Sequence, residues 1–242
     1  MANNAANTLL IVGSPELITS LKAAIDTKTQ KIDFNAIIMP VPAELKNTSA
    51  PVEIVEDPAE AARINLEWNA RLGTGPGTKI RALTREQAAR LMRQYGAVDW
   101  HQWTQTNWNA ARLNGEITVY HATSTAIMLS FDTAWSAPTT LLDYLHRQRG
   151  AQIIGATAAE GEADLEIHLL LDDEPGLSDN EAAYRDELIF DHFFTIHSQV
   201  EDAGTETEYR YSWVQYNGDV TALLGRPKLT TGSLLELRRS LP

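Results

Sequence analysis

Four of the six tryptophans lie in two short segments that also contain polar side chains able to bind a ligand or transfer a proton. Large aromatic side chains with a polar edge either pack in a core or form a recognition surface. Because Trp100 and Trp103 lie three residues apart in an expected helix, core packing is the first interpretation. The alternative is a Trp-rich binding cluster. Its members would be Asp99, Trp100, His101, Trp103, Asn107, Trp108, Asp132 and Trp135.

Residue spacing identifies no metal centre and no catalytic nucleophile in this sequence. The six histidines show no His-Glu-x-x-His pattern, and His192 and His197, five residues apart, would lie on opposite faces of a strand. No Gly-x-Ser-x-Gly elbow is present, although a Ser-His-Asp triad can assemble from distant positions. The absence of cysteine excludes a thiolate zinc site, a cysteine nucleophile and an iron–sulfur cluster. We therefore predict no catalytic residue, no metal and no cofactor.

A glycine-rich segment, GTGPGTK at residues 73–79, has the composition of a phosphate-binding loop. It follows an expected helix instead of a strand, and it lacks the four-residue spacing before Gly-Lys-Ser/Thr that such a loop needs. We therefore interpret it as a flexible turn.

Acidic residues are concentrated in one contiguous part of the chain. Residues 160–208 contain sixteen acidic residues and one basic residue, Arg185, whereas the rest of the chain contains sixteen acidic and nineteen basic residues. One interpretation is a solvated surface, and the other is a binding face. Carboxylates after a strand could also bind Mg²⁺ or Ca²⁺, but an acidic turn is far commoner. The candidate acidic face consists of Glu162, Asp164, Glu166, Asp172, Asp173 and Glu174.

Overall composition narrows the classes of function. The 242 residues, 43% of them hydrophobic, are enough for a core. A formal net charge of −12 opposes long-range attraction to phosphate, so we expect no direct binding to nucleic acid. No window approaches the roughly 20 apolar residues of a membrane span, and the N-terminus lacks a signal-peptide pattern. We therefore expect a cytoplasmic protein with no membrane contact.

The expected elements fall in the order β-α-β, insertion, β-α-β. Ser14 and Pro15 predict the start of a helix with Leu17, Ile18, Leu21 and Ile25 as its apolar stripe. The insertion, residues 44–115, shows helical stripes and a capping box at Thr84 and Gln87. A further helix opens at 136–138 and stops at Gly150. Strands are expected at residues 8–13, 34–39, 117–122, 124–131 and 152–157.

This order predicts an α+β fold: a ferredoxin-like split βαβ antiparallel sheet with a helical insertion and a β-rich C-terminal extension. Residues 1–160 would form the ferredoxin-like domain. Residues 161–242 would form an acidic β-rich extension packed on the same domain, with strand candidates at 165–171, 188–198 and 209–213 and a short helix at 233–241.

Four blocks of sequence occur in the order found in one family. They are Asn3 and Asn7 before TLLIVG; IIMPVPAEL at 37–45; Tyr95, Gly96, Trp100, Trp103, Asn107 and Trp108; and FDTAWSAP at 131–138. On these blocks, residues 1–160 resemble the YubB-like family with a ferredoxin-like domain, encoded by plasmids and phages. The chain departs from the family where Asn4 and Ala5 replace a Trp-Cys pair, and where a Gly-Thr-Lys-Trp step after Trp108 is missing.

The resemblance implies a setting in a mobile genetic element but no reaction. Together with the acidic segment it suggests a non-catalytic accessory protein that binds a host or element-encoded protein. The partner would be a host defence or nucleic-acid-handling protein whose basic groove is inhibited by a DNA-mimic-like surface. A second hypothesis is a single-stranded nucleic-acid-binding module that stacks bases on Tyr209, Tyr211 and Trp213. A third is an enzyme of unknown reaction using the Trp-rich cluster. The sequence leaves the oligomeric state open.

Overall fold

The chain forms two units, one built from both ends of the sequence and the other from its middle. The computed structural model describes residues 4–26, 28–33, 35, 40–110, 117–159, 165–172, 178, 180, 182–183, 190, 194–202 and 208–216. Unit 1 comprises Met1–Ile38 and Arg112–Pro242, and unit 2 comprises Met39–Ala111. Unit 2 thus corresponds closely to the insertion expected at residues 44–115.

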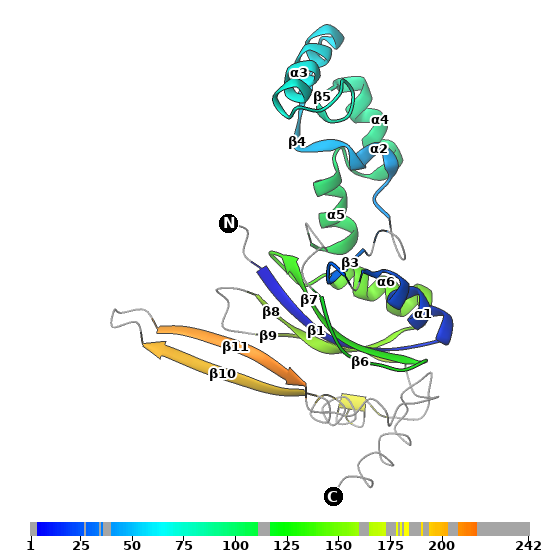
Figure 1. Cartoon of the computed structure of the whole chain (residues 1–242), viewed down its shortest axis with the longest axis vertical. Helices are drawn as coiled ribbons and strands as arrows, with labels where there is room; N and C mark the ends of the chain where they lie inside the picture. The colour runs from blue at the N-terminus through cyan, green and yellow to red at the C-terminus, as the bar shows by residue number, and fades with distance from the viewer. Residues whose placement is uncertain are drawn as a thin grey trace, which may run out of the picture. The chain divides into compact units, whose positions relative to one another are not determined.

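Unit 1 contains a five-stranded sheet in the order β6-β7-β1-β8-β9, in which every neighbouring pair is antiparallel. Helices α1 and α6 lie on the same side of this sheet (Figure 1). The predicted α+β class with an antiparallel sheet is therefore confirmed. The bounds are β1 (Asn4–Val12), α1 (Pro15–Ala23), β6 (Ile117–Ala122), β7 (Ala126–Ala134), α6 (Thr139–Arg149), β8 (Gln152–Ala159) and β9 (Leu165–Leu170).

The two faces of the sheet are buried to different extents along β1. The positions of β1 on one face are all at most 1% exposed: Ala5, Asn7, Leu9 and Ile11. The apolar residues of α1 and α6 are buried as well. Since the apolar cluster on the other face contains no residue of either helix, we assign the fully buried face to the helix side of the sheet.

The opposite face carries an apolar cluster. It consists of Leu10, Val12, Ala126, Met128, Ile154, Ala156, Phe190 and Phe194. The members of this cluster that belong to the sheet extend from the C-terminal end of β1 to Ala156, which pairs with Thr8. Nearer the N-terminal end of β1, Thr8 is only partly buried and Ala6 is exposed. Among the described residues, this end of the face is the more exposed one, and we call it the open half.

Local sequence signals account for both helices of unit 1. The Ser14 hydroxyl accepts the N–H of Leu17 at 3.3 Å, and Pro15 occupies the first turn, as predicted. Gly150, at φ +66°, ends α6 in the left-handed conformation that glycine adopts readily. The prediction that Ile25 extends the stripe of α1 is wrong. Ile25 instead lies in the short strand β2 (Ile25–Asp26) and pairs with Ile32 of β3 (Lys31–Ile32), as suits a β-branched residue.

The strand expected at 124–131 begins and ends later, as β7. The Thr123 hydroxyl accepts the N–H groups of Thr125 and Ala126, so the chain is still turning at residue 125. Ile127, Leu129 and Phe131 lie on one buried face, as period-2 alternation predicts. Met128 is buried on the other face by the apolar cluster.

The C-terminal part of unit 1 adds a hairpin. The hairpin strands are β10 (Phe194–Asp202) and β11 (Glu208–Tyr216). The strand expected at 188–198 thus starts at Phe194. Apart from Asn35, the strand expected at 34–39 lies outside the described residues, as does the helix expected at 233–241.

Unit 2 is not only helical, which corrects the prediction of a helical insertion. Its bounds are α2 (Ala43–Lys46), β4 (Thr48–Val55), α3 (Pro58–Arg71), β5 (Ile80–Thr84), α4 (Arg85–Tyr95) and α5 (Trp100–Trp108). β4 and β5 pair in parallel, and α3 connects them, since parallel neighbours need a long crossover. The capping box of Thr84 and Gln87 is confirmed at the start of α4.

Among the helices within the described ranges, none has the length and apolar composition of a membrane-spanning segment.

Candidate functional site

A cavity of about 210 Å³ lies on the open half of the sheet in unit 1. It is lined by four strands, β1, β6, β7 and β8. The lining residues are Ala6, Thr8, Tyr120, Ser130, Asp132, Ala156 and Ala158. We take this cavity as the candidate functional site.

Strand register brings the lining together. Ala6 of β1 pairs with Asp132 of β7 and Ala158 of β8, and Thr8 pairs with Ser130. Because residues two apart on a strand point to the same face, these positions share one face of the sheet. The small alanine side chains leave the space that the cavity occupies, whereas the larger Leu10 and Met128 fill the covered half.

The lining is polar on the side of β6 and β7. The hydroxyls of Tyr120 and Ser130 lie 3.3 Å apart, within hydrogen-bonding distance. Asp132 is the single charged residue among the seven that line the cavity. The site therefore offers a carboxylate and hydroxyl oxygens, which are acceptors for a donor-rich or cationic group.

A buried polar row crosses the same sheet on its helix side. The Asn7 amide nitrogen donates to the Thr133 hydroxyl at 3.0 Å, and the Thr157 hydroxyl donates to Asn7 Oδ1 at 2.8 Å. Thr157 Oγ1 also lies 2.7 Å from His168 Nε2. Each of the four side chains is at most 6% exposed. The row satisfies polar groups that would otherwise be costly to bury.

The hydrogen bonds of the row define the state of His168. The Thr157 hydroxyl has one hydrogen, which goes to Asn7, so His168 Nε2 must carry the proton that it shares with Thr157. Burial lowers the pKa of His168 to about 4, because a charged imidazolium loses its hydration there. His168 is therefore a neutral structural histidine at neutral pH.

Trp135 follows β7 and has an unusual backbone. Its φ is +79°, in the left-handed region that large side chains rarely adopt, and the residue is 55% exposed. The Thr133 hydroxyl donates to the Ser136 carbonyl at 2.7 Å and so ties this turn to the polar row. A strained, exposed tryptophan is consistent with a recognition surface.

The predicted Trp-rich cluster is divided between the two units. Asp132 and Trp135 belong to unit 1, and the other members belong to unit 2. Trp103 and Trp108 are buried, and their rings meet edge to face with centroids 5.6 Å apart. For this pair, the interpretation as core packing is confirmed.

The polar members of the cluster in unit 2 have local structural roles. Asp99 caps α5 by accepting the N–H of Gln102 at 2.8 Å, and the Asn107 amide donates to the Trp103 carbonyl at 2.9 Å. His101 is exposed, with its ring edge-on to Trp100. These contacts explain the residues as helix structure, and their role in a site stays a prediction.

Two members of the candidate acidic face can be located. Glu166 is exposed on β9, and Asp172 is partly buried just after that strand. Glu162, Asp164, Asp173 and Glu174 lie outside the described residues. Within those residues, no group of three His, Cys, Asp or Glu side chains is arranged to hold a metal ion.

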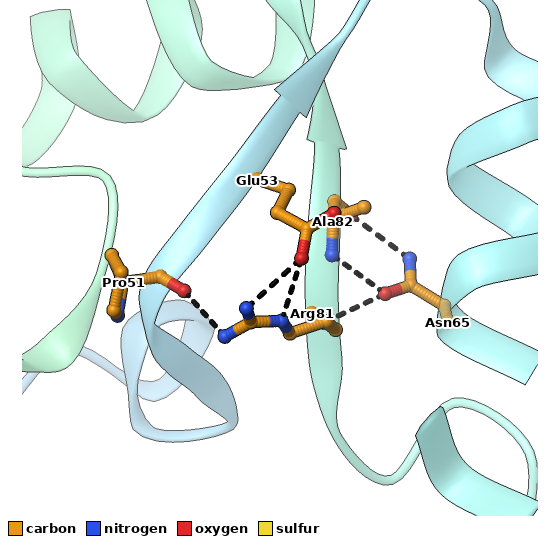
Figure 2. A network of polar contacts seen from close by, with 5 residues as sticks. All are labelled: Pro51, Glu53, Asn65, Arg81 and Ala82. Carbon is orange, nitrogen blue, oxygen red and sulfur yellow. Dashed lines mark hydrogen bonds and ion pairs between the residues drawn. The ribbon is translucent and has the colours of Figure 1, made fainter. Parts of the chain in front are cut away.

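In unit 2, the Asn65 side chain of α3 is hydrogen-bonded to the backbone of strand β5 (Figure 2). Asn65 Oδ1 accepts the N–H groups of Arg81 and Ala82 at 2.7 and 2.8 Å, and its amide donates to the Ala82 carbonyl at 2.9 Å. Arg81 also pairs with Glu53 at 2.9 Å and donates to the Pro51 carbonyl. These side chains satisfy backbone groups that an exposed strand edge would leave unpaired.

The glycine-rich segment at 73–79 is a turn, as predicted. Asn69, only 1% exposed, accepts the N–H of Lys79 and the hydroxyl of Thr74, both at 2.9 Å. The Asn69 amide donates to the Lys79 carbonyl at 2.7 Å. This turn leads into β5 and is organised by a side chain of α3. Gly73 and Gly77 adopt positive φ angles of 65° and 78° in it, which explains the use of glycine at these two positions.

Sequence reasoning included Asp132 among its candidates but missed the other residues around the cavity. Tyr120 and Ser130 each lie on a correctly expected strand, and period-2 alternation could have assigned them a face. What the alternation could not supply is which strands are neighbours. No protein-family model, curated protein or solved structure matches this chain.

Proposed function

We propose that this chain is a non-catalytic accessory protein that binds a basic protein partner through unit 1. The observation that carries the proposal is the separation of charge between the units. Unit 2 contains eight acidic and eight basic residues, which leaves twenty-four acidic and twelve basic residues in unit 1. The whole net charge of −12 therefore belongs to the unit that has the open sheet face.

We further propose that unit 1 has a ferredoxin-like arrangement. The order β6-β7-β1-β8, the antiparallel pairings and the positions of α1 and α6 in the chain support it, and β9 would then be an added edge strand. In such sheets the face without helices is the common binding face.

The charge on that face favours a protein over a nucleic acid. Single-stranded nucleic acids are bound by grooves that combine aromatic platforms with Lys and Arg. Here the cavity has one exposed aromatic residue, Tyr120, and its charged residue is Asp132. A carboxylate at this place repels phosphate and attracts a cationic side chain.

The resemblance to the YubB-like family supports a partner encountered by a mobile genetic element. We propose a host or element-encoded protein with a basic nucleic-acid groove, which the acidic unit would occupy and inhibit. Carboxylates can compete for such a groove because they present negative charge where phosphates would bind.

An affinity experiment tests this function. Tagged protein is incubated with nuclease-treated bacterial lysate at 50 and 300 mM NaCl, and the captured partner is purified and rebound. We expect a stoichiometric partner whose affinity falls steeply with salt.

The matched variants are Glu162→Gln with Glu166→Gln in unit 1 and Glu60→Gln with Glu86→Gln in unit 2. Both pairs remove two negative charges, but only the first pair should weaken the rebinding. Capture of no protein partner, or of a partner whose affinity responds equally to both pairs, would contradict the proposal.

A further inference from the structure

We propose that the cavity on the open half of the sheet receives an arginine side chain of the partner, with the guanidinium group on Asp132. This inference rests on the proposed function and specifies the chemistry that unit 1 recognises. It starts from the residues that line the cavity, which are four polar or charged side chains and three alanines.

The size of the cavity suits one side chain. Pockets for drug-sized ligands and cofactors begin at about 300 Å³, and this cavity has about 210 Å³. Its alanine floor, formed by Ala6, Ala156 and Ala158, gives the aliphatic part of a long side chain an apolar surface to lie on. A single inserted side chain is therefore a better occupant than a nucleotide or a free cofactor.

The polar groups of the lining favour a cation with several donors. Asp132 supplies a carboxylate, and the hydroxyl oxygens of Thr8, Ser130 and Tyr120 supply further acceptors. A guanidinium group has five donors in a plane and can bond to the carboxylate through two of them. Lysine has a compact ammonium group and would leave more of these acceptors unused.

The aromatic ring of Tyr120 adds a second preference for arginine. Tyr120 belongs to the edge strand β6 and is 51% exposed, while its hydroxyl is held near Ser130 at 3.3 Å. Planar guanidinium groups stack on such rings more favourably than ammonium groups. Charge complementarity acts in the same direction, since unit 1 carries the entire net negative charge of the chain.

The test compares two labelled peptides, tetra-arginine and tetra-lysine, by fluorescence anisotropy at 150 mM NaCl. Both peptides have the same charge, so the ratio of their affinities separates recognition of guanidinium from general attraction. We expect wild-type protein to bind tetra-arginine about tenfold more tightly than tetra-lysine. Asp132→Asn, which keeps the shape of the side chain, should reduce this ratio to about one. Tyr120→Leu, at an exposed edge position, serves as a second variant and should lower the ratio several-fold.

Glu16→Gln is the matched control. It removes the same charge from the same unit, but Glu16 is exposed in the first turn of α1, which lies on the helix side of the sheet. The control should weaken both peptides slightly and leave the ratio unchanged.

Two results would contradict the proposal of an arginine-binding cavity. One is equal affinity of the wild-type protein for the two peptides, and the other is an affinity ratio that is unchanged in Asp132→Asn. If both peptides still bind and Glu16→Gln weakens both, the attraction of unit 1 for a basic partner stands without the cavity. Binding of neither peptide would count against the proposed function as well.

Discussion

Protonation of His168 should make unit 1 progressively less stable as the pH falls from about 6.5 to 4. His168 is 6% exposed, and burial lowers its pKa to about 4, against about 6.5 in an unfolded chain. Between these values the unfolded state binds a proton that the folded state does not. The free energy of unfolding is therefore unaffected above pH 6.5 and is lost as the pH falls toward the folded pKa.

The size of this effect follows from the difference in pKa. One pH unit of difference corresponds to about 1.4 kcal/mol, so a separation of roughly two and a half units gives about 3 kcal/mol in total. Most ordinary carboxyl groups titrate at about pH 4 or below. The loss between pH 6.5 and 5 should therefore come mainly from the histidine.

The assay is urea denaturation of wild-type protein and His168→Gln at several pH values from 7 to 4. Glutamine keeps an N–H donor for Thr157 but cannot take up a proton. Resolved amide resonances of β1 and β8 report on unit 1 alone, because unit 2 contributes none of them. We expect the wild-type protein to lose about 3 kcal/mol more than the variant over this range.

A control histidine completes the design. His121 lies on the edge strand β6, outside the polar row, and is only partly buried, so His121→Gln controls for the loss of a histidine as such. Parallel profiles for wild-type protein and His168→Gln would refute the reasoning. They would mean that the folded protein accommodates a charged imidazole at the end of the polar row.

Two further predictions concern packing and the strand edge in unit 2. Gly155→Ala should destabilise unit 1 by about 3 kcal/mol in urea denaturation, because the added Cβ would lie 2.2 Å from the Thr8 carbonyl oxygen. Gly75→Ala is its control, since the added Cβ would lie 3.7 Å from the Thr78 hydroxyl oxygen, an ordinary contact distance. Equal stabilities of the two variants would contradict this account. Asn65→Ala should cost unit 2 about 2 kcal/mol by leaving backbone groups of β5 without partners. Leu66→Ala, at an exposed position on the same helix, should change the free energy of unfolding little. A similar loss in both variants would argue against a stabilising role of the Asn65 hydrogen bonds to β5.

Several elements could be predicted because their signals are local. The cap at Ser14, the capping box of Thr84 and Gln87 and the stop at Gly150 each depend on residues within one helical turn. The burial of Trp103 was also predictable from its spacing along a helix. Such features need no knowledge of what lies elsewhere in the fold.

Other elements depend on partners that are distant in the sequence, and local patterns predicted their secondary structure wrongly. Strand β4 was predicted as part of a helical insertion. It is stabilised by pairing with β5, which is separated from it in the sequence by the whole of helix α3, so its own residues carry little strand signal. Ile25 fits the stripe of α1 by period, but pairing with Ile32 takes it into a strand. Tertiary context overrides local preference in both cases.

The sequence by itself determined the acidity of the chain, the positions of most strands and the buried faces of its helices. Only the tertiary structure decided that β1 lies between β7 and β8, which brings Asp132, Ser130 and Thr8 to one cavity and Asn7, Thr157 and His168 to one buried row. The physical reason is that alternation along a strand fixes which side chains share a face, whereas strand order and register depend on contacts between residues more than a hundred positions apart.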